Sequence, residues 1–239
     1  TLRAQPTVAA IKGLEDGAVN PFRFCQELAA TLERKGVKIF EDTEVRHISE
    51  ERNKVLPHTK HGAVIAKTCF IMADGYFPVC GFSDPKMKKP RIIYAVVSTP
   101  LTSEMKSAIG WSGREIAWNT KDDFDYFRIL PDDRILFGTS TEKKEPDLPT
   151  DLPLEEGYRR FTRDRLCQVF PQLKGLDVPY CWGGSIGQRD YPLPFMRKLG
   201  ERVWGAGGYN GDGLLPGFLA GKLLTEALLE KRKIPSIFQ

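Results

Sequence analysis

The chain lacks the features that mark several large classes of protein. None of the apolar runs in its 239 residues approaches the ~20 residues that a membrane-spanning helix needs. No secretory signal is visible at its start. Its 35 Lys and Arg residues are scattered among 31 Asp and Glu residues, for a net charge of +4, and the one basic run, residues 86–91, is typical of a solvated loop. The sequence therefore predicts neither a membrane span nor a nucleic-acid partner.

Cysteine and histidine are few, and neither has the spacing of a metal site. The cysteines are odd in number, widely spaced and never paired as CxxC, so they predict neither a disulfide framework nor a zinc site. Unpaired thiols are typical of a reducing compartment, which predicts an intracellular protein of the cytoplasm or of an organellar matrix. His58 and His61 share a polar turn that holds no acid or cysteine to complete a metal site. No metal is expected.

Helix and strand patterns alternate at both ends of the chain, and strand patterns dominate its middle. Asn20 followed by Pro21 predicts a helix start, and apolar residues at helical spacing continue as far as Gly36. The segments VKIF and CFIMAD predict buried strands, the second ending at Asp74. FDYFRIL and RILFG predict a hairpin joined by PDD, and a helix is expected over residues 154–169. The pattern predicts an α/β fold with an inserted antiparallel sheet.

The densest cluster of glycines lies near the C-terminus, in GAGGYNGDGLLPGFLAG (residues 205–221). A strand pattern precedes it and an amphipathic helix follows it. Glycines let backbone N–H groups approach a ligand closely, and a helix N-terminus favours an anionic or electron-rich group. The cluster therefore predicts a ligand loop. A tight strand-to-helix turn with no ligand is the alternative, because GxGxxG-like patterns also arise by chance.

The ordered motifs of the chain resemble the FAD-dependent oxidoreductases of the D-amino-acid oxidase superfamily. The segments that carry the resemblance are DGAVNPFRFCQELAATLERKGVKIFEDTEV, GAVIAKTCFIMADGY, FDYFRILPDDRILFG, WGGSIGQRDYPLP and the final glycine cluster with its helix. The γ-glutamylputrescine oxidase-like branch fits best, beside the glycine and sarcosine oxidases. The resemblance implies a partial Rossmann-like FAD-binding domain with an inserted antiparallel β-sheet substrate domain.

The resemblance also implies domain boundaries. It divides the chain into a substrate-domain lead-in (1–19), the middle part of the FAD-binding domain (20–82), the antiparallel substrate domain (83–180) and the C-terminal part of the FAD-binding domain (181–239).

The same resemblance assigns roles to single residues. It implies that the backbone of the glycine cluster faces the pyrimidine edge of the flavin and that Val45 meets the adenine. Residues 73–75 are expected to line the dinucleotide, and Arg128 is either a substrate-facing residue or an ordinary charge of the hairpin. The cofactor-binding candidates are Val45, Ala73, Asp74, Gly75, Gly207, Gly208, Tyr209, Asn210, Gly211, Asp212 and Gly213.

The sequence departs from the family pattern at four places. The chain has no N-terminal GxGxxG unit, so an upstream segment or a partner chain is expected to supply it. Ser185 stands where amino-acid oxidases carry a carboxylate-binding arginine. Asp212 stands where the family often has histidine, and it would oppose an anionic reduced flavin unless it points to solvent. Some members tether the flavin through a cysteine; here Cys181 is displaced in register and is expected to be a buried core thiol.

Two functions follow from these observations. The first is flavin-dependent oxidation of the C–N bond of an amine or amino-acid-like substrate by hydride transfer to FAD. The chain would then be the C-terminal portion of the enzyme. The second is a non-catalytic scaffold or assembly subunit with a degenerate form of the same fold, which binds FAD weakly or not at all.

Overall fold

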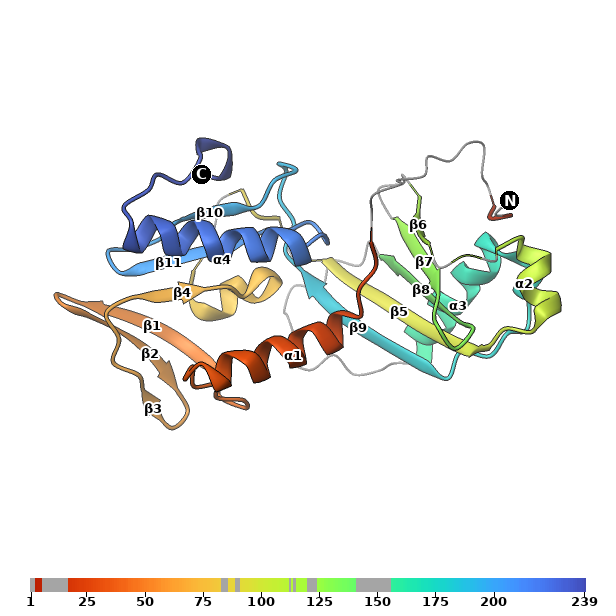
Figure 1. Ribbon diagram of the computed structural model, residues 1–239, viewed down its shortest axis with the longest axis horizontal. Coiled ribbons are helices and arrows are strands. Elements are labelled where there is room, and N and C mark those ends of the chain that lie inside the picture. The colour runs from red at the N-terminus through yellow and green to blue at the C-terminus, as the bar shows by residue number, and fades with distance from the viewer. Residues whose placement is uncertain are drawn as a thin grey trace. The chain divides into compact units, whose positions relative to one another are not determined.

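The computed structural model describes residues 3–5, 17–82, 86–88, 91–111, 113, 115–119, 124–140 and 156–239. The chain divides into two compact units (Figure 1). Unit 1 comprises Thr1–Ala18 and Ile92–Gly184, and unit 2 comprises Val19–Arg91 and Ser185–Gln239. The expected boundary at residue 83 and the expected helix start at residue 154 lie outside the described residues. The predicted mixed α/β fold class is confirmed.

Unit 1 is built on a five-stranded sheet with the strand order β6-β7-β8-β5-β9. Its strands are β5 (Arg91–Pro100), β6 (Ile116–Trp118), β7 (Asp125–Ile129), β8 (Arg134–Ser140) and β9 (Tyr180–Ile186). The helices are α2 (Ser103–Ile109), α3 (Glu156–Val169) and the short η2 (Pro171–Leu173). Alternate residues of β7, Phe127 and Ile129, pack with Leu166 of α3 in one hydrophobic cluster. The helices therefore cover one face of the sheet.

A buried ion pair joins that sheet to α3. The Asp125 side chain is fully buried, and its two carboxylate oxygens accept hydrogen bonds from Arg165 Nε (3.0 Å) and Nη2 (2.9 Å). Asn119 Nδ2 (2.7 Å) and Thr139 Oγ1 (2.8 Å) donate to the same carboxylate. These contacts hold Asn119, β8 and α3 to a single point on β7.

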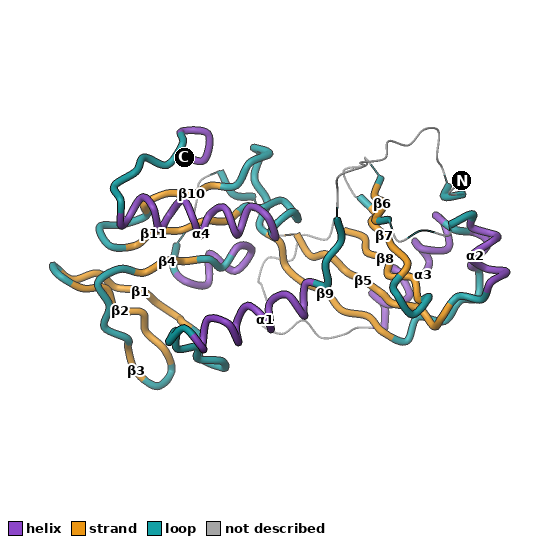
Figure 2. Tube along the Cα trace, viewed as in Figure 1, coloured by secondary structure: helices purple, strands orange, loops and turns teal. Residues whose placement is uncertain are grey.

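Unit 2 contains two small sheets, shown with the helices in Figure 2. The first is the antiparallel sheet β1 (Val45–Glu51), β2 (Lys54–Thr59) and β3 (Gly62–Ala63). In the second, β11 (Val203–Gly207) pairs antiparallel with β10 (Phe195–Lys198) and parallel with β4 (Cys69–Ile71). The helices are α1 (Pro21–Arg34), η1 (Asp74–Cys80), α4 (Leu214–Leu229) and η3 (Ser236–Phe238). Ala220 and Leu224 of α4 pack against Met196 and Ala206 of the second sheet.

The start of α1 confirms the helix signal in the sequence. Asn20 Oδ1 accepts a hydrogen bond from the Arg23 N–H (3.1 Å), and Pro21 occupies the first helical position. The predicted strand VKIF is wrong, because residues 37–40 form no strand. Its apolar side chains lack a sheet to cover them in the described part of the chain, and Phe40 remains 69% exposed.

Two further expectations concern absences. Among the described residues, no helix is both long enough and apolar enough to cross a membrane. The same residues contain no cluster of three or more His, Cys, Asp or Glu side chains able to hold a metal ion. His58 Nε2 lies 2.8 Å from Ser49 Oγ, within one small sheet.

Candidate functional site

Asp74 links the end of β4 to two other segments of unit 2. One oxygen of its carboxylate, Oδ1, accepts hydrogen bonds from the backbone N–H groups of Gly208 (2.9 Å) and Tyr209 (3.2 Å). The other, Oδ2, accepts one from the N–H of Gly187 (2.8 Å). The residue itself has φ +41°, a left-handed conformation that Asp and Asn adopt more readily than other side chains. A single carboxylate thus joins β4, the segment after β9 and the glycine cluster after β11.

Close packing accompanies these bonds. A Cβ atom added to Gly187 would lie 2.7 Å from Asp74 Oδ1. A Cβ added to Gly207 would lie 3.5 Å from Asp74 Cα. The structure therefore brings the predicted site residues 73–75 and 207–209 together. Val45 lies at the start of β1, where it packs with Ile48 in the cluster beneath them.

Asn210 fastens the loop to residues 187–192. Its side-chain oxygen accepts a hydrogen bond from the Arg189 N–H (2.8 Å), and its Nδ2 donates to the Tyr191 carbonyl (3.0 Å). Its own N–H donates to the Gly187 carbonyl (3.0 Å). Asn210 was predicted to bind the cofactor, and in this structure its polar side-chain groups bond to the protein. The sequence does not predict these side-chain bonds, because the partners lie 21 and 19 residues away along the chain.

The start of α4 presents donors that no side chain caps. Gly213 precedes the helix and carries no capping group, and Pro216 has no N–H. The N–H groups of Leu214 and Leu215 have no intrahelical acceptor at this helix end. Asp212 is exposed in this structure, which is the arrangement under which its charge would not oppose an anionic group. A helix start of this kind suits an electron-rich ligand edge.

Three buried polar atoms around the loop have no hydrogen-bond partner among the described residues. They are Ser185 Oγ, Arg189 Nε and Tyr209 Oη. Arg189 is only 6% exposed, and it forms no ion pair within the described part of the chain; its guanidinium lies 5.7 Å from the centre of the Phe195 ring. A buried polar atom left unpaired costs about 1–3 kcal/mol, so such atoms mark places where a ligand can supply the partner. The residues fit a cofactor with a hydrogen-bonding edge.

The Tyr209 hydroxyl gives a testable consequence. Burial, and secondly the nearby charge of Asp74, raise the pKa of Tyr209 to about 12. Because the folded pKa lies above the unfolded one, the free energy of unfolding is unaffected by this phenol below pH ~10 and falls as the pH rises toward about 12. We expect Tyr209→Phe to leave the free energy of unfolding at pH 7 unchanged or raised by about 0.5–1 kcal/mol, because the lost hydroxyl has no partner.

Urea denaturation tests the stability of this variant, and phenolate absorbance during alkaline titration tests the assignment. The latest-titrating phenol should be missing in Tyr209→Phe. A loss of more than about 1 kcal/mol, the energy of one neutral hydrogen bond, would mean that the hydroxyl has a partner.

Unit 1 offers a second surface, the sheet face opposite its helices. On β7 the residues between the buried ones are Tyr126 and Arg128, so the pleat places them on this open face. Tyr126 lies across Gly138 of the neighbouring strand, and burial raises its pKa. The largest exposed aromatic side chain nearby is Trp118 of β6, at 65%. Arg128 therefore lies on the same face of the sheet as Tyr126.

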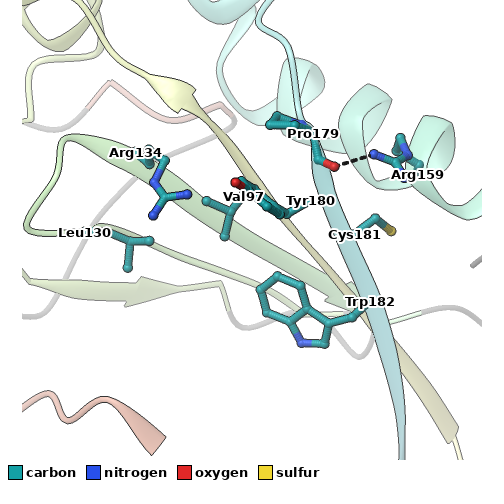
Figure 3. A pocket seen from close by; sticks show the side chains of 8 residues that line it. All are labelled: Val97, Leu130, Arg134, Arg159, Pro179, Tyr180, Cys181 and Trp182. Carbon is teal, nitrogen blue, oxygen red and sulfur yellow. Dashed lines mark hydrogen bonds between the residues drawn. The ribbon is translucent and has the colours of Figure 1, made fainter. Parts of the chain in front are cut away.

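A cavity of about 310 Å³ lies along β9 in the same unit (Figure 3). Its lining residues are Val97, Leu130, Arg134, Arg159, Pro179, Tyr180, Cys181 and Trp182. Arg134 lies 5.4 Å from the centre of the Tyr180 ring, and Arg159 Nη1 donates to the Pro179 carbonyl (2.7 Å). Cys181 packs in the hydrophobic core of unit 1, as expected of a core thiol, and burial raises its pKa.

Comparison with known proteins gives one consistent match. A family model described as FAD dependent oxidoreductase (DAO) matches residues 2–227. A probable oxidoreductase OrdL of Haemophilus influenzae is 27% identical over 227 residues, which cover 93% of this chain and 50% of that protein. The γ-glutamylputrescine oxidoreductase of Escherichia coli is 25% identical over 214 residues, covering 89% and 48%. The chain thus spans about half the length of the curated relatives that it matches.

Solved structures show the same fold at lower identity. The L-proline dehydrogenase from P. horikoshii superposes with a TM-score of 0.69 and 18% identity, over 91% of this chain and 57% of that chain. The glycine oxidase from Geobacillus kaustophilus gives a TM-score of 0.67 and 20% identity, over 88% and 54%.

Proposed function

Because this chain belongs to the DAO family of FAD-dependent oxidoreductases, we propose that it is the C-terminal portion of an enzyme that oxidises the C–N bond of an amine or amino acid. The names of its relative, a γ-glutamylputrescine oxidoreductase, and of its structural neighbours, a glycine oxidase and an iminodiacetate oxidase, support the substrate class. FAD, when bound, supplies the hydride acceptor for such an oxidation.

The observation that carries the proposal is the glycine loop, residues 207–213, followed by the uncapped N-terminus of helix α4. The N–H groups of Leu214 and Leu215 would hold the electron-rich edge of the flavin. The partial positive charge of the α4 N-terminus would stabilise added negative charge there. Ser185 Oγ and Tyr209 Oη, both buried without partners among the described residues, would find acceptors or donors on the same ligand.

The open face of the unit 1 sheet is the proposed substrate surface. Tyr126, Trp118 and Trp182 offer aromatic area that would exclude water from a bound amine. Arg128 is proposed to orient the substrate from the same face. In family members of this kind the protein chiefly positions the substrate, so no conspicuous base is required.

Uncovered apolar surface in unit 2 supports an upstream segment or partner chain that carries the GxGxxG unit. Helix α1 has no buried residue, and Phe22 on it is 68% exposed. Leu215 on α4 is 80% exposed. Strand β4 is an edge of its sheet within the described chain, with β11 on one side only. A βαβ unit added at this edge would cover these side chains and supply the pyrophosphate loop.

The test is the visible spectrum of the full-length protein. We expect it to purify with flavin bands, and the released cofactor to be FAD by mass. A colourless protein that also fails to take up added FAD would contradict the proposal and would favour the non-catalytic scaffold.

A further inference from the structure

Four backbone N–H groups of the glycine loop donate hydrogen bonds to other groups of the protein. The N–H groups of Gly208 and Tyr209 bond to Asp74, and that of Asn210 bonds to the Gly187 carbonyl. The Asp212 N–H donates to the Tyr209 carbonyl (3.0 Å). The N–H of Gly211 and those at the helix end of the loop, from Gly213 onward, remain for a ligand. We therefore expect only part of the backbone of residues 207–213 to face the flavin.

We propose that Asp74 is a positioning residue that holds the glycine loop against the end of β4 and so fixes which loop donors a ligand can use. The loop-holding role stands on the contacts of the chain alone. Its effect on FAD rests on the proposed function. Asp74 is not proposed to contact the reacting atoms.

A carboxylate suits this position for two reasons. Three donors converge on it, two on Oδ1 and one on Oδ2, and an aspartate offers acceptor oxygens at both positions whereas an asparagine offers one. An asparagine could keep the pair of bonds to Gly208 and Tyr209, but its NH₂ group would then face the N–H of Gly187. The backbone φ of +41° is tolerated equally by Asp and Asn, so this substitution isolates the missing acceptor.

The negative charge of Asp74 also reaches the loop. It is the second cause, after burial, of the raised pKa of Tyr209. Asp74→Asn should therefore lower the pKa of Tyr209 part of the way, since burial remains. A side chain that served only to fill space would not move this value when replaced by its isostere.

The experiment measures amide hydrogen exchange in the full-length protein without added FAD. In the wild type, the Gly208 and Tyr209 amides should be protected and the Gly211 amide should exchange faster. In Asp74→Asn, exchange at Gly187 and at Gly208–Tyr209 should accelerate about tenfold or more, as expected for losing a charge-assisted hydrogen bond. Asp74→Gly, which keeps the backbone conformation, serves as a second variant if Asp74→Asn does not fold.

Asp133→Asn is the matched control. Asp133 also has a left-handed φ (+64°), but its carboxylate contacts Lys106 Nζ (2.9 Å) at the surface. This control should leave exchange in the glycine loop unchanged. Unprotected Gly208 and Tyr209 amides in the wild type, or unchanged exchange in both Asp74 variants, would overturn the proposal.

FAD titration separates this proposal from the function it refines. If the wild type binds FAD, Asp74→Asn should weaken binding by about tenfold, the factor expected from a displaced set of donors. Unchanged affinity despite faster exchange would overturn the positioning role. If the wild type binds no FAD, the proposed function fails, and the exchange measurements alone decide whether Asp74 holds the loop.

Discussion

Arg165→Met is expected to lower the free energy of unfolding of unit 1 by about 3–5 kcal/mol, because it leaves the fully buried Asp125 carboxylate without its cation. Both carboxylate oxygens accept from the guanidinium, at 3.0 and 2.9 Å. Methionine fills a similar volume, so lost packing contributes little. Urea denaturation followed by tryptophan fluorescence measures the loss.

Arg163→Met provides the matched control on the same helix. Arg163 is half exposed, and its nearest acid is the neighbouring Asp164, at 3.4 Å. An exposed pair of this kind contributes about 0–1 kcal/mol, so its loss should be small. The double variant Asp125→Asn/Arg165→Met should regain part of the stability, because no buried charge remains. Equal losses in Arg165→Met and Arg163→Met would contradict the account.

Elements with a local signal could be predicted from the sequence. The Asn20-Pro21 start of α1 and the β7–β8 hairpin depend on neighbours within a few residues, and both are present. Helix α2 was missed, although it carries such a signal: Thr102 Oγ1 accepts the Met105 N–H (3.2 Å), and Gly110 ends the helix with φ +64°. The threonine before this helix and the glycine after it mark its two ends in the sequence.

Elements that depend on distant partners could not be predicted in this way. Strand β10 has only four residues, and its pairing with β11 defines it. The reverse holds for VKIF, whose β-rich composition predicts a strand but which has no strand to pair with in the described chain. A hydrophobic pattern predicts that a side chain is buried, but it does not predict which element packs against it.

The candidate site also combines features with a local sequence signal and features that depend on distant residues. The sequence locates the glycine loop and its helix, because glycine spacing and helical periodicity are local. It also selects Asp74, but as a residue that lines the ligand. The bonds from Asp74 to Gly187 and Gly208 span 113 and 134 residues, so only the fold reveals that this acid holds the loop. FAD was predicted from the order of the family motifs and not from any one residue.

Gly208→Ala should be the most damaging single substitution in the glycine loop. Gly208 has φ +72°, where an added Cβ costs about 1–2 kcal/mol. That Cβ would also collide with Cγ and Cδ of Arg189, which is buried and cannot swing into solvent. Overpacking of this kind costs about 1–3 kcal/mol more. We expect unit 2 to lose about 2–5 kcal/mol of unfolding free energy, the sum of these two costs. Affinity for added FAD should fall with it.

Gly175→Ala separates the two costs. Gly175 has a similar φ of +88°, but no atom lies within 4 Å of an added Cβ. Its replacement should therefore cost only the backbone strain of about 1–2 kcal/mol. Removing the obstacle should rescue the loop variant: in Gly208→Ala/Arg189→Ala the added methyl group enters the space that the arginine left, so the pair should couple favourably. If Gly208→Ala costs no more than Gly175→Ala, Arg189 does not pack beneath the loop, and the buried guanidinium must lie elsewhere.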